Sequence, residues 1–158
     1  MIQTASAKGL MIATAESLTA GDLAARIADT PGASRVLAGG VVSYQDQIKS
    51  QLLGVSAQLI ATSSAVDPEV AIHMAVGVRE KFSSAMGVDS GNLIGISTTG
   101  VAGPDSVGSK PVGEVYIGLS APSGEKVFVF QFTGSRGEIR AATVSKALEI
   151  LGEEISNF

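Results

Sequence analysis

Short apolar runs and stretches of apolar residues at helical spacing follow one another along this chain. Runs typical of buried strands occupy residues 10–14, 36–44 and 93–98. Apolar residues recur at helical spacing in 15–29, 45–53, 67–86 and 136–151. Two further apolar runs, 113–121 and 126–133, flank the turn sequence Pro-Ser-Gly-Glu and predict a β-hairpin.

Glycine, proline and acidic residues mark several boundaries of these elements. Asp67, Pro68 and Glu69 supply a cap, a first-turn proline and a first-turn acid, which together predict a helix start. Gly9 is expected to end a short opening helix, and Gly39–Gly40 indicates a β-bulge or a close backbone approach. The order of elements predicts an α/β fold: a three-layer α/β/α sandwich with a mixed, mainly parallel sheet and a C-terminal β-hairpin.

The chain has 158 residues, of which 45% are hydrophobic and 16% are charged. This length fits one domain over residues 1–158, and this composition supports a buried core and excludes the disordered class. The net charge of −4 leaves no basic face for long nucleic acid or an anionic membrane. No apolar run approaches the roughly 18 residues of a membrane span, and the N-terminus lacks the regions of a signal peptide. We therefore expect a cytoplasmic protein that binds neither nucleic acid nor membranes.

The absence of cysteine excludes disulfides, a thiolate nucleophile and cysteine-ligated metal. His73 is the only histidine, so a zinc site would consist almost wholly of carboxylates, which zinc seldom uses. His73 shares a helix face with Glu69 and Glu80, which predicts a surface residue instead of a catalytic base. The sequence therefore predicts no metal site and no cofactor.

Three polar segments follow predicted strands, and in open α/β sheets ligands bind beyond the carboxyl ends of the strands. In the first segment, Ser17, Thr19 and Gly21 lie at a strand-to-helix turn, where free backbone N–H groups attract anions and oxyanions. Alternatively, Ser17 or Thr19 caps the helix, which is the commonest use of serine and threonine there. The residues alone leave both interpretations open.

The second polar segment, 43–49, contains Tyr44 at a strand end and Lys49 about one helical turn later. A lysine kept uncharged by burial can replace the histidine that activates a serine nucleophile. With one histidine available, a serine–lysine pair is the natural way for this chain to make a nucleophile. The alternative is a solvated lysine beside a half-buried tyrosine, since lysine is mostly exposed in proteins.

The third polar segment, 97–105, and the glycine-rich loop after it have the composition of a cradle for phosphate or carboxylate. Residues 103–110 approach the pattern G-x-x-x-x-G-K-S, but serine precedes lysine and Pro111 does not open a helix, which argues against nucleoside-triphosphate hydrolysis. Arg136 begins the last predicted helix, where it is either an anion clamp or a solvated residue. Arg140, one turn later, is the reserve candidate.

Several motifs together resemble one protein family. They are Thr-Ala-Glu-Ser-Leu-Thr-Ala-Gly (14–21), Gly-Gly-Val-Val-Ser-Tyr-Gln-Asp-Gln-Ile-Lys (39–49), Leu-Leu-Gly-Val (52–55), Thr-Gly-Val-Ala-Gly-Pro-Asp (99–105), Lys-Pro-Val-Gly-Glu-Val-Tyr-Ile (110–117) and Phe-Thr-Gly-Ser-Arg (132–136). Their order and spacing over nearly the whole chain resemble the CinA C-terminal domain family. That family includes stand-alone nicotinamide mononucleotide deamidases, which hydrolyse the carboxamide to give nicotinic acid mononucleotide and ammonia.

The resemblance implies that Ser17 is the nucleophile and that Tyr44 and Lys49 complete the catalytic set, with no metal or organic cofactor. The residues that it implies in substrate binding are Glu16, Thr19, Thr99, Gly100 and Arg136. The implied partners are a small-molecule mononucleotide and further copies of the same chain, as a dimer or a larger homo-oligomer. In the implied reaction, Lys49 takes the Ser17 proton directly or through Tyr44, and N–H groups at the start of the following helix stabilise the oxyanion.

Two positions beside Ser17 depart from the family motif. Leu18 and Ala20 stand where cysteine and a second glycine are usual, so Ala20 bears on the backbone geometry next to the nucleophile. The alternative hypothesis is a non-catalytic mononucleotide-binding protein that acts as an oligomeric partner. Saturable ligand binding without ammonia release would distinguish it from an enzyme.

Overall fold

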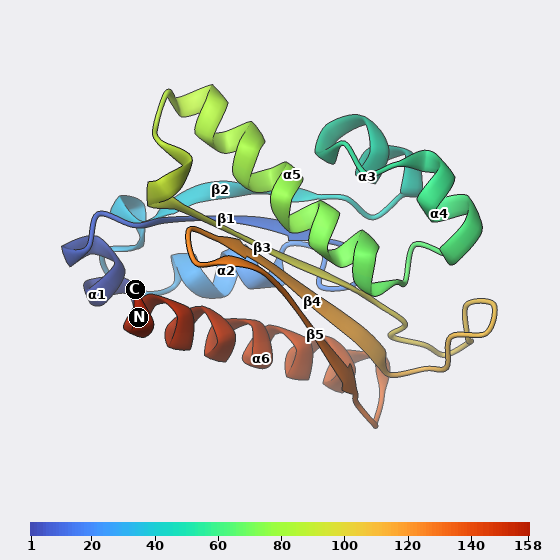
Figure 1. Ribbon diagram of the computed structural model, residues 1–158. Coiled ribbons are helices and arrows are strands. Elements are labelled where there is room, and N and C mark those ends of the chain that lie inside the picture. Colours follow the sequence, from blue (N-terminus) through green and yellow to red (C-terminus); the bar gives the residue numbers. More distant parts are fainter.

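A five-stranded sheet forms the middle layer of the molecule in a computed structural model that describes residues 1–158 (Figure 1). The strands are β1 (Met11–Glu16), β2 (Leu37–Val42), β3 (Leu93–Gly100), β4 (Glu114–Ala121) and β5 (Gly124–Gln131), in the spatial order β2-β1-β3-β4-β5. β1 is parallel to β2 and to β3, whereas β4 is antiparallel to both β3 and β5. Only β4 therefore opposes the common strand direction, which confirms a mixed and mainly parallel sheet.

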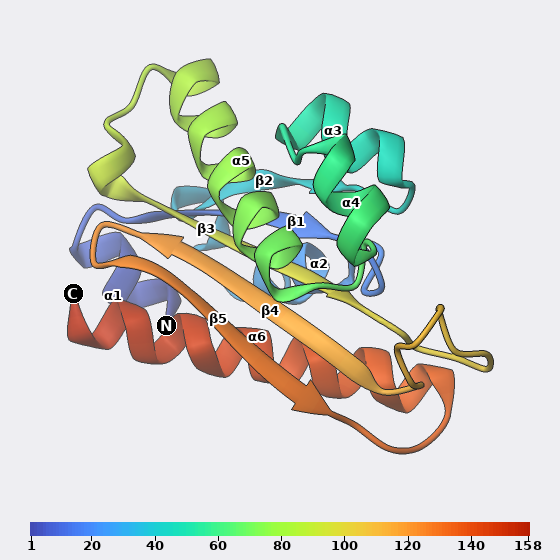
Figure 2. The ribbon, with the colours of Figure 1, turned by 45° about the vertical axis from the view of Figure 1, so that its right-hand side comes forward.

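Helices cover both faces of the sheet (Figures 1 and 2). One face carries α3 (Asp46–Leu53), α4 (Ala57–Ser63) and α5 (Pro68–Met86), and the other carries α1 (Ile2–Ala7), α2 (Asp22–Ala28) and α6 (Arg136–Asn157). Short 3-10 turns at Ala33–Arg35 and Ser90–Asn92 precede β2 and β3. The three-layer prediction is confirmed. No helix is both long enough and apolar enough to cross a membrane.

Alternation along the strands divides the core between the two faces of the sheet. On β1, Ile12 belongs to the cluster beneath α6, whereas Ala13 and Ala15 belong to the cluster beneath α5. Successive side chains of a strand point to opposite faces, so one strand supplies both cores. The small alanines on the α5 side let that helix approach the sheet closely.

Local signals in the sequence act as predicted at two boundaries. The Asp67 carboxylate accepts a hydrogen bond of 2.8 Å from the Glu69 N–H and caps α5. The ladder of β1 and β2 shifts register between the residues paired with Leu37 and Gly39, which is the expected bulge. A side chain at Gly39 would also meet the Phe82 ring, 2.6 Å from its Cβ.

The start of α2 was predicted wrongly. Helical spacing suggested a helix from residue 15, but β1 continues to Glu16 and α2 begins only at Asp22. The intervening turn contains left-handed residues, Ala20 with φ 54° and Gly21 with φ 98°, and such residues interrupt a right-handed helix. Five residues that would have been helical therefore form the turn that presents Ser17.

Glu154 near the end of α6 makes stability depend on pH. Its burial alone would raise the pKa of this carboxyl, but hydrogen bonds from Lys126, at 2.7 Å, and from Ser123 outweigh burial and hold the pKa below its ordinary value. A depressed pKa means that the folded protein binds this proton more weakly than the unfolded chain. The stabilisation is therefore present above the ordinary carboxyl pKa of about 4.3 and is lost as pH falls through the folded value.

We expect Glu154→Gln to lower the free energy of unfolding by about 1 to 2 kcal/mol at pH 7, since the amide loses the ion pair with Lys126. The difference between the two proteins should shrink as the pH falls below 4, where the wild-type carboxyl is increasingly protonated. Urea denaturation at pH 7 and at pH 3.5 measures both values. A difference that is the same at the two pH values would contradict this role of the ionised carboxylate.

Candidate active site

A cavity of about 350 Å³ lies beyond the carboxyl ends of β1 and β3. Four segments that are distant in the sequence form its walls: the turn after β1, the α3–α4 region, the glycine-rich loop after β3 and the first residue of α6. The predicted site residues that line it are Ser17, Tyr44, Lys49, Thr99, Gly100 and Arg136. The predicted site residues that do not line it are Glu16 and Thr19.

Lys49 is buried in the wall of this cavity. Its side chain is 2% exposed, and its Nζ lies 3.2 Å from a carboxylate oxygen of Asp46 and 3.4 Å from the backbone oxygen of Tyr44. The interpretation of Lys49 as a solvated surface residue is therefore wrong. Asp46, which also lines the cavity, was missed, although a spacing of three residues on one helix is the usual signal of such a pair.

Arg136 joins two walls of the cavity at its mouth. Its guanidinium donates hydrogen bonds of 2.7 Å to the Tyr44 hydroxyl and of 2.7 Å to the Gly103 carbonyl. The Tyr44 hydroxyl thus faces Arg136, and Lys49 touches only the backbone of Tyr44. No hydrogen bond links the phenol to Lys49, so a proton relay through Tyr44 lacks its first contact in this arrangement.

Ser17 follows β1 and extends the ladder that this strand makes with β3. Its N–H donates to the Thr98 carbonyl at 2.9 Å, and its hydroxyl has no hydrogen-bond partner within the protein. On the adjacent strand end, the Ser43 N–H donates to the Glu16 carbonyl at 2.8 Å. The Ser17 hydroxyl is thus available to a bound molecule.

Ser43 was not among the predicted site residues. Its hydroxyl is the one buried polar side-chain atom in the chain that lacks a hydrogen-bond partner. Register places Ser43 beside Ser17 on the α5 face of the sheet, with Thr99 of β3 on the other side of Ser17. Strand alternation was the signal for this row of hydroxyls, because Val41, two residues earlier, also packs beneath α5.

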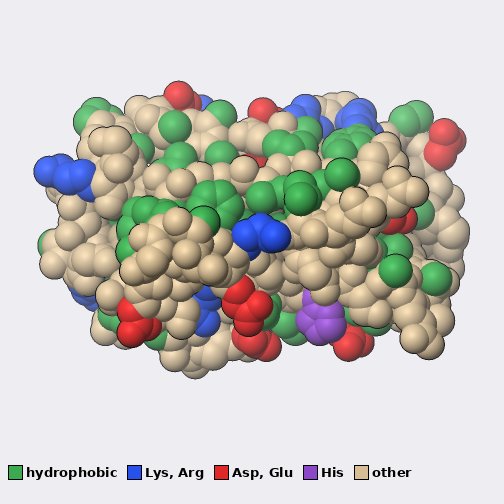
Figure 3. Space-filling view, turned by 90° about the horizontal axis from the view of Figure 1, so that it is seen from above, with side chains coloured by type: hydrophobic (Ala, Val, Ile, Leu, Met, Phe, Trp, Pro, Cys, Tyr) green, Lys and Arg blue, Asp and Glu red, His purple; other side chains and the backbone are tan.

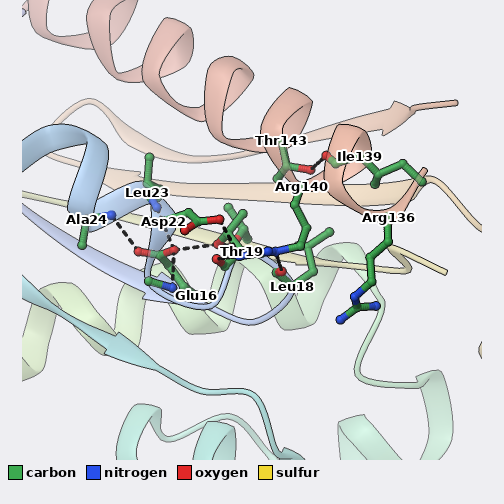
Figure 4. A network of polar contacts seen from close by, with 12 residues as sticks. Glu16, Leu18, Thr19, Asp22, Leu23, Ala24, Arg136, Ile139, Arg140 and Thr143 are labelled. Carbon is green, nitrogen blue, oxygen red and sulfur yellow. Dashed lines mark hydrogen bonds and ion pairs between the residues drawn. The ribbon is translucent and has the colours of Figure 1, made fainter. Parts of the chain in front are cut away.

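Glu16 has a structural role (Figure 4). Its carboxylate is almost completely buried and accepts hydrogen bonds of 2.7–3.2 Å from three backbone N–H groups and two hydroxyls, those of Gly21, Leu23, Ala24, Thr14 and Thr19. Glu16 therefore caps α2, and the alternative interpretation of Ser17 or Thr19 as the cap is wrong. The N–H groups at the start of α2 are occupied, so the predicted source of oxyanion stabilisation is wrong as well.

Thr19 supports this cap from below the turn. Its hydroxyl contacts Glu16 at 2.7 Å and the Thr98 hydroxyl at 2.7 Å, and it is fully buried. The structure thus places Glu16 and Thr19 beneath the cavity instead of on its surface. Their predicted part in substrate binding is corrected to a part in holding the turn.

Ala20 adopts a left-handed conformation in which a glycine has no steric penalty. The penalty for other residues is about 1–2 kcal/mol. We expect Ala20→Gly to raise the free energy of unfolding by up to about 1 kcal/mol, since the greater entropy of unfolded glycine offsets part of the gain. The matched control is Ala25→Gly, within α2, which should lower it by about 0.5–1 kcal/mol. Urea denaturation measures the change in the free energy of unfolding of both variants. A loss of stability in Ala20→Gly would contradict the backbone strain at Ala20.

The glycine-rich loop between β3 and β4 is anchored outside the cavity. Lys110 lies 3.0 Å from a carboxylate oxygen of Glu114 and 3.2 Å from the Tyr116 hydroxyl, which itself donates to Glu114 at 2.6 Å. The hydrogen bond from Tyr116, helped by Lys110, holds the pKa of Glu114 below its ordinary value despite its partial burial. The loop leads into β4, not into a helix, so the sequence argument against a nucleotide-triphosphate loop is confirmed.

Other candidate groups lie away from the cavity. His73 lies at the surface of α5 and is visible from outside, as predicted (Figure 3). No three His, Asp or Glu side chains gather where they could hold a metal ion. The functional groups that line the cavity are a free hydroxyl, a buried amine, a phenol, a guanidinium and the carboxylates of Asp46 and Asp105.

These features define an α/β domain with a cavity, lined by polar side chains, at the carboxyl ends of its parallel strands. The chain belongs to the CinA C-terminal domain family, which it matches over residues 1–155.

Relatives and solved structures support this assignment. The chain is 49% identical over 142 residues to a competence-damage inducible protein of Desulforamulus reducens and 43% identical over 145 residues to a CinA-like protein of Desulfotalea psychrophila. These alignments cover 90% and 91% of this chain but 33% of each relative, so the chain spans about a third of their length.

Among solved structures, a CinA superfamily protein of Klebsiella pneumoniae aligns with a TM-score of 0.87 at 29% identity, covering 99% of this chain and 93% of that one. The competence/damage inducible protein CihA of Agrobacterium tumefaciens aligns with a TM-score of 0.84 at 33% identity, covering 95% and 88%.

Proposed function

We propose that this chain is an amidohydrolase that converts nicotinamide mononucleotide to nicotinic acid mononucleotide and ammonia. The observation that carries the proposal is that the unpartnered Ser17 hydroxyl and the buried Lys49 amine line one cavity. The chain has no cysteine, and its one histidine, His73, lies outside the cavity. A serine activated by a lysine is thus the nucleophile that these residues can form.

In the proposed reaction, uncharged Lys49 takes the proton of the Ser17 hydroxyl as the serine oxygen bonds to the carboxamide carbon. The electron pair of the carbonyl moves to its oxygen and gives a tetrahedral oxyanion. The carbon–nitrogen bond then breaks, and the leaving amine takes the proton from Lys49 and departs as ammonia. Water attacks the acyl-enzyme with Lys49 again as base, releasing the acid and restoring Ser17. Asp46 supports this cycle by stabilising the ammonium form of Lys49 between the two transfers.

The charges along the cavity supply an orientation for the substrate. Lys49 is buried, whereas Arg136 is exposed at the mouth. A guanidinium binds phosphate through paired hydrogen bonds, so Arg136 would hold the phosphate of the mononucleotide. The carboxamide then reaches the deeper region that holds Ser17 and Lys49, with Thr99 and Gly100 along the wall.

The test is ammonia release from nicotinamide mononucleotide, with the acid product identified by chromatography. We expect the wild-type protein to turn over and Ser17→Ala to lose roughly a hundredfold or more of kcat, since its nucleophile is gone. Ser145→Ala, on the exposed side of α6, is the matched control and should keep the wild-type rate. Saturable binding of the mononucleotide without ammonia release would contradict the proposal and favour a non-catalytic binding protein.

A further inference from the structure

Arg140 binds the backbone of the turn that carries Ser17. From the first turns of α6, its guanidinium donates hydrogen bonds of 2.9 Å to the Leu18 carbonyl and 2.8 Å to the Thr19 carbonyl, and it forms an ion pair with Asp22 (Figure 4). All three contacts join residues that are far apart in the sequence. Nε and Nη2 of Arg140 are thus used within the protein, which argues against its reserve role as a ligand-binding residue.

The hydrogen bond from Arg140 to the Leu18 carbonyl fixes the direction of the Leu18–Thr19 peptide group. The C=O and N–H of a trans peptide point to opposite sides. Because Arg140 holds the Leu18 carbonyl, the plane of the Leu18–Thr19 peptide is fixed, with the buried Thr19 N–H on its opposite edge. The position of Leu18, which lines the cavity together with Ser17, is restrained with it.

Two N–H groups of this turn have no acceptor within the protein. Those of Ser17, Ala20 and Asp22 donate to backbone oxygens of Thr98, Ser17 and Thr19, at 2.9–3.2 Å. The N–H groups of Leu18 and Thr19 donate to none. Thr19 is fully buried beneath the cavity, so the donor that a ligand there can use is the Leu18 N–H. A free N–H directly after a nucleophilic serine is the usual donor to an oxyanion.

We propose that Arg140 is a positioning residue: by holding the turn after Ser17, it keeps the free Leu18 N–H in place for the oxyanion formed when Ser17 attacks an amide. This inference rests on the proposed amide hydrolysis and replaces the start of α2, which Glu16 occupies, as the source of the stabilising donor. Asp22 holds the guanidinium in place from the first turn of α2.

The discriminating variant is Arg140→Lys, which keeps the charge but cannot span two carbonyls as the planar guanidinium does. We expect kcat to fall about 10- to 100-fold with KM within about twofold of the wild-type value, because the oxyanion exists only in the transition state and the intermediates beside it. Arg26→Lys, whose ion pair with Asp29 is exposed, is the matched control and should leave both constants unchanged.

A thioamide analogue of the substrate distinguishes oxyanion positioning from a purely structural role of Arg140. A purely structural role would leave the ratio of amide to thioamide kcat unchanged. Its developing charge lies on sulfur, a weaker hydrogen-bond acceptor, so donors aimed at an oxyanion contribute less. The ratio of amide to thioamide kcat should therefore be lower in Arg140→Lys than in the wild-type protein. A fall in kcat with an unchanged ratio, or an unchanged kcat, would overturn the inference.

The outcomes separate this inference from the proposed function. A wild-type protein that releases no ammonia contradicts the function, whereas normal wild-type turnover with an unaffected Arg140→Lys contradicts only the positioning role. If Arg140→Lys fails to fold, Asp22→Asn loosens the same guanidinium through its exposed partner. For Asp22→Asn we expect a loss of about two- to tenfold in kcat with the same change in the amide-to-thioamide ratio, and wild-type values would overturn the role of Arg140.

Discussion

Lys49→Met is expected to lower the rate of amide hydrolysis by about two to four orders of magnitude while the fold stays as stable as before or becomes more stable. Methionine has a similar length and removes the base. The stability follows from burial: the side chain of Lys49 is 2% exposed, and replacing a buried amine with an apolar side chain relieves its desolvation cost. Asp46, its partner, is 58% exposed, so water takes over the hydrogen bond that it loses.

Single-turnover kinetics and urea denaturation measure the two halves of this prediction separately. Lys146→Met is the matched control, because Lys146 pairs with Glu149 on the exposed surface of α6. This variant should keep the wild-type activity. Parental turnover in Lys49→Met would remove the base from the proposed mechanism. A large loss of stability would instead show that Lys49 is a structural residue.

Glu16→Ala is expected to lower the free energy of unfolding by about 3–5 kcal/mol, because it leaves several buried donors without an acceptor. Glu16→Gln is the more informative change. One carboxylate oxygen accepts from the Ala24 N–H, and the other accepts from the N–H groups of Gly21 and Leu23. The amide nitrogen of glutamine would meet a backbone donor in either orientation, so we expect a loss of about 1–3 kcal/mol.

Urea denaturation checks both Glu16 variants against Glu149→Gln, an exposed position where the change should stay within about 0.5 kcal/mol. A measurement of KM for the mononucleotide could contradict the structural role of Glu16. If Glu16→Gln unfolds at the wild-type urea concentration but raises KM for the mononucleotide, then Glu16 binds substrate as the family resemblance implied, and its assignment as the cap of α2 is wrong.

Much of the fold was predictable because burial imposes a period on the sequence. The apolar runs became β1, β2 and β3, and the cap at Asp67 started α5 at Pro68. The helix α4 was not predicted, and it has no fully buried residue that would impose such a period. The late start of α2 was missed because hydrophobic spacing does not report a left-handed residue such as Ala20.

The sequence predicts that the candidate site residues at the ends of strands come together in the fold. Ser17 and Thr99 follow or end parallel strands and Tyr44 follows β2, so the shared strand direction brings them to one edge of the sheet. The roles of Glu16 and Arg140 were not predictable, because they depend on which backbone groups a folded turn leaves open. Arg140 meets Leu18 only after α6 has packed beside that turn.

The position of β1 between β2 and β3 has a consequence for refolding. β1 pairs residues 11–16 with residues 93–98, so this ladder closes only after most of the chain has been made and brought together. Closing so long a loop has an entropic cost that local helices do not face, and topologies rich in distant pairings fold slowly. The Ser17 N–H sits at the end of this ladder, on the Thr98 carbonyl. After dilution from denaturant, the helical circular-dichroism signal should therefore return first. The proposed amide hydrolysis should return later, with the slowest kinetic phase.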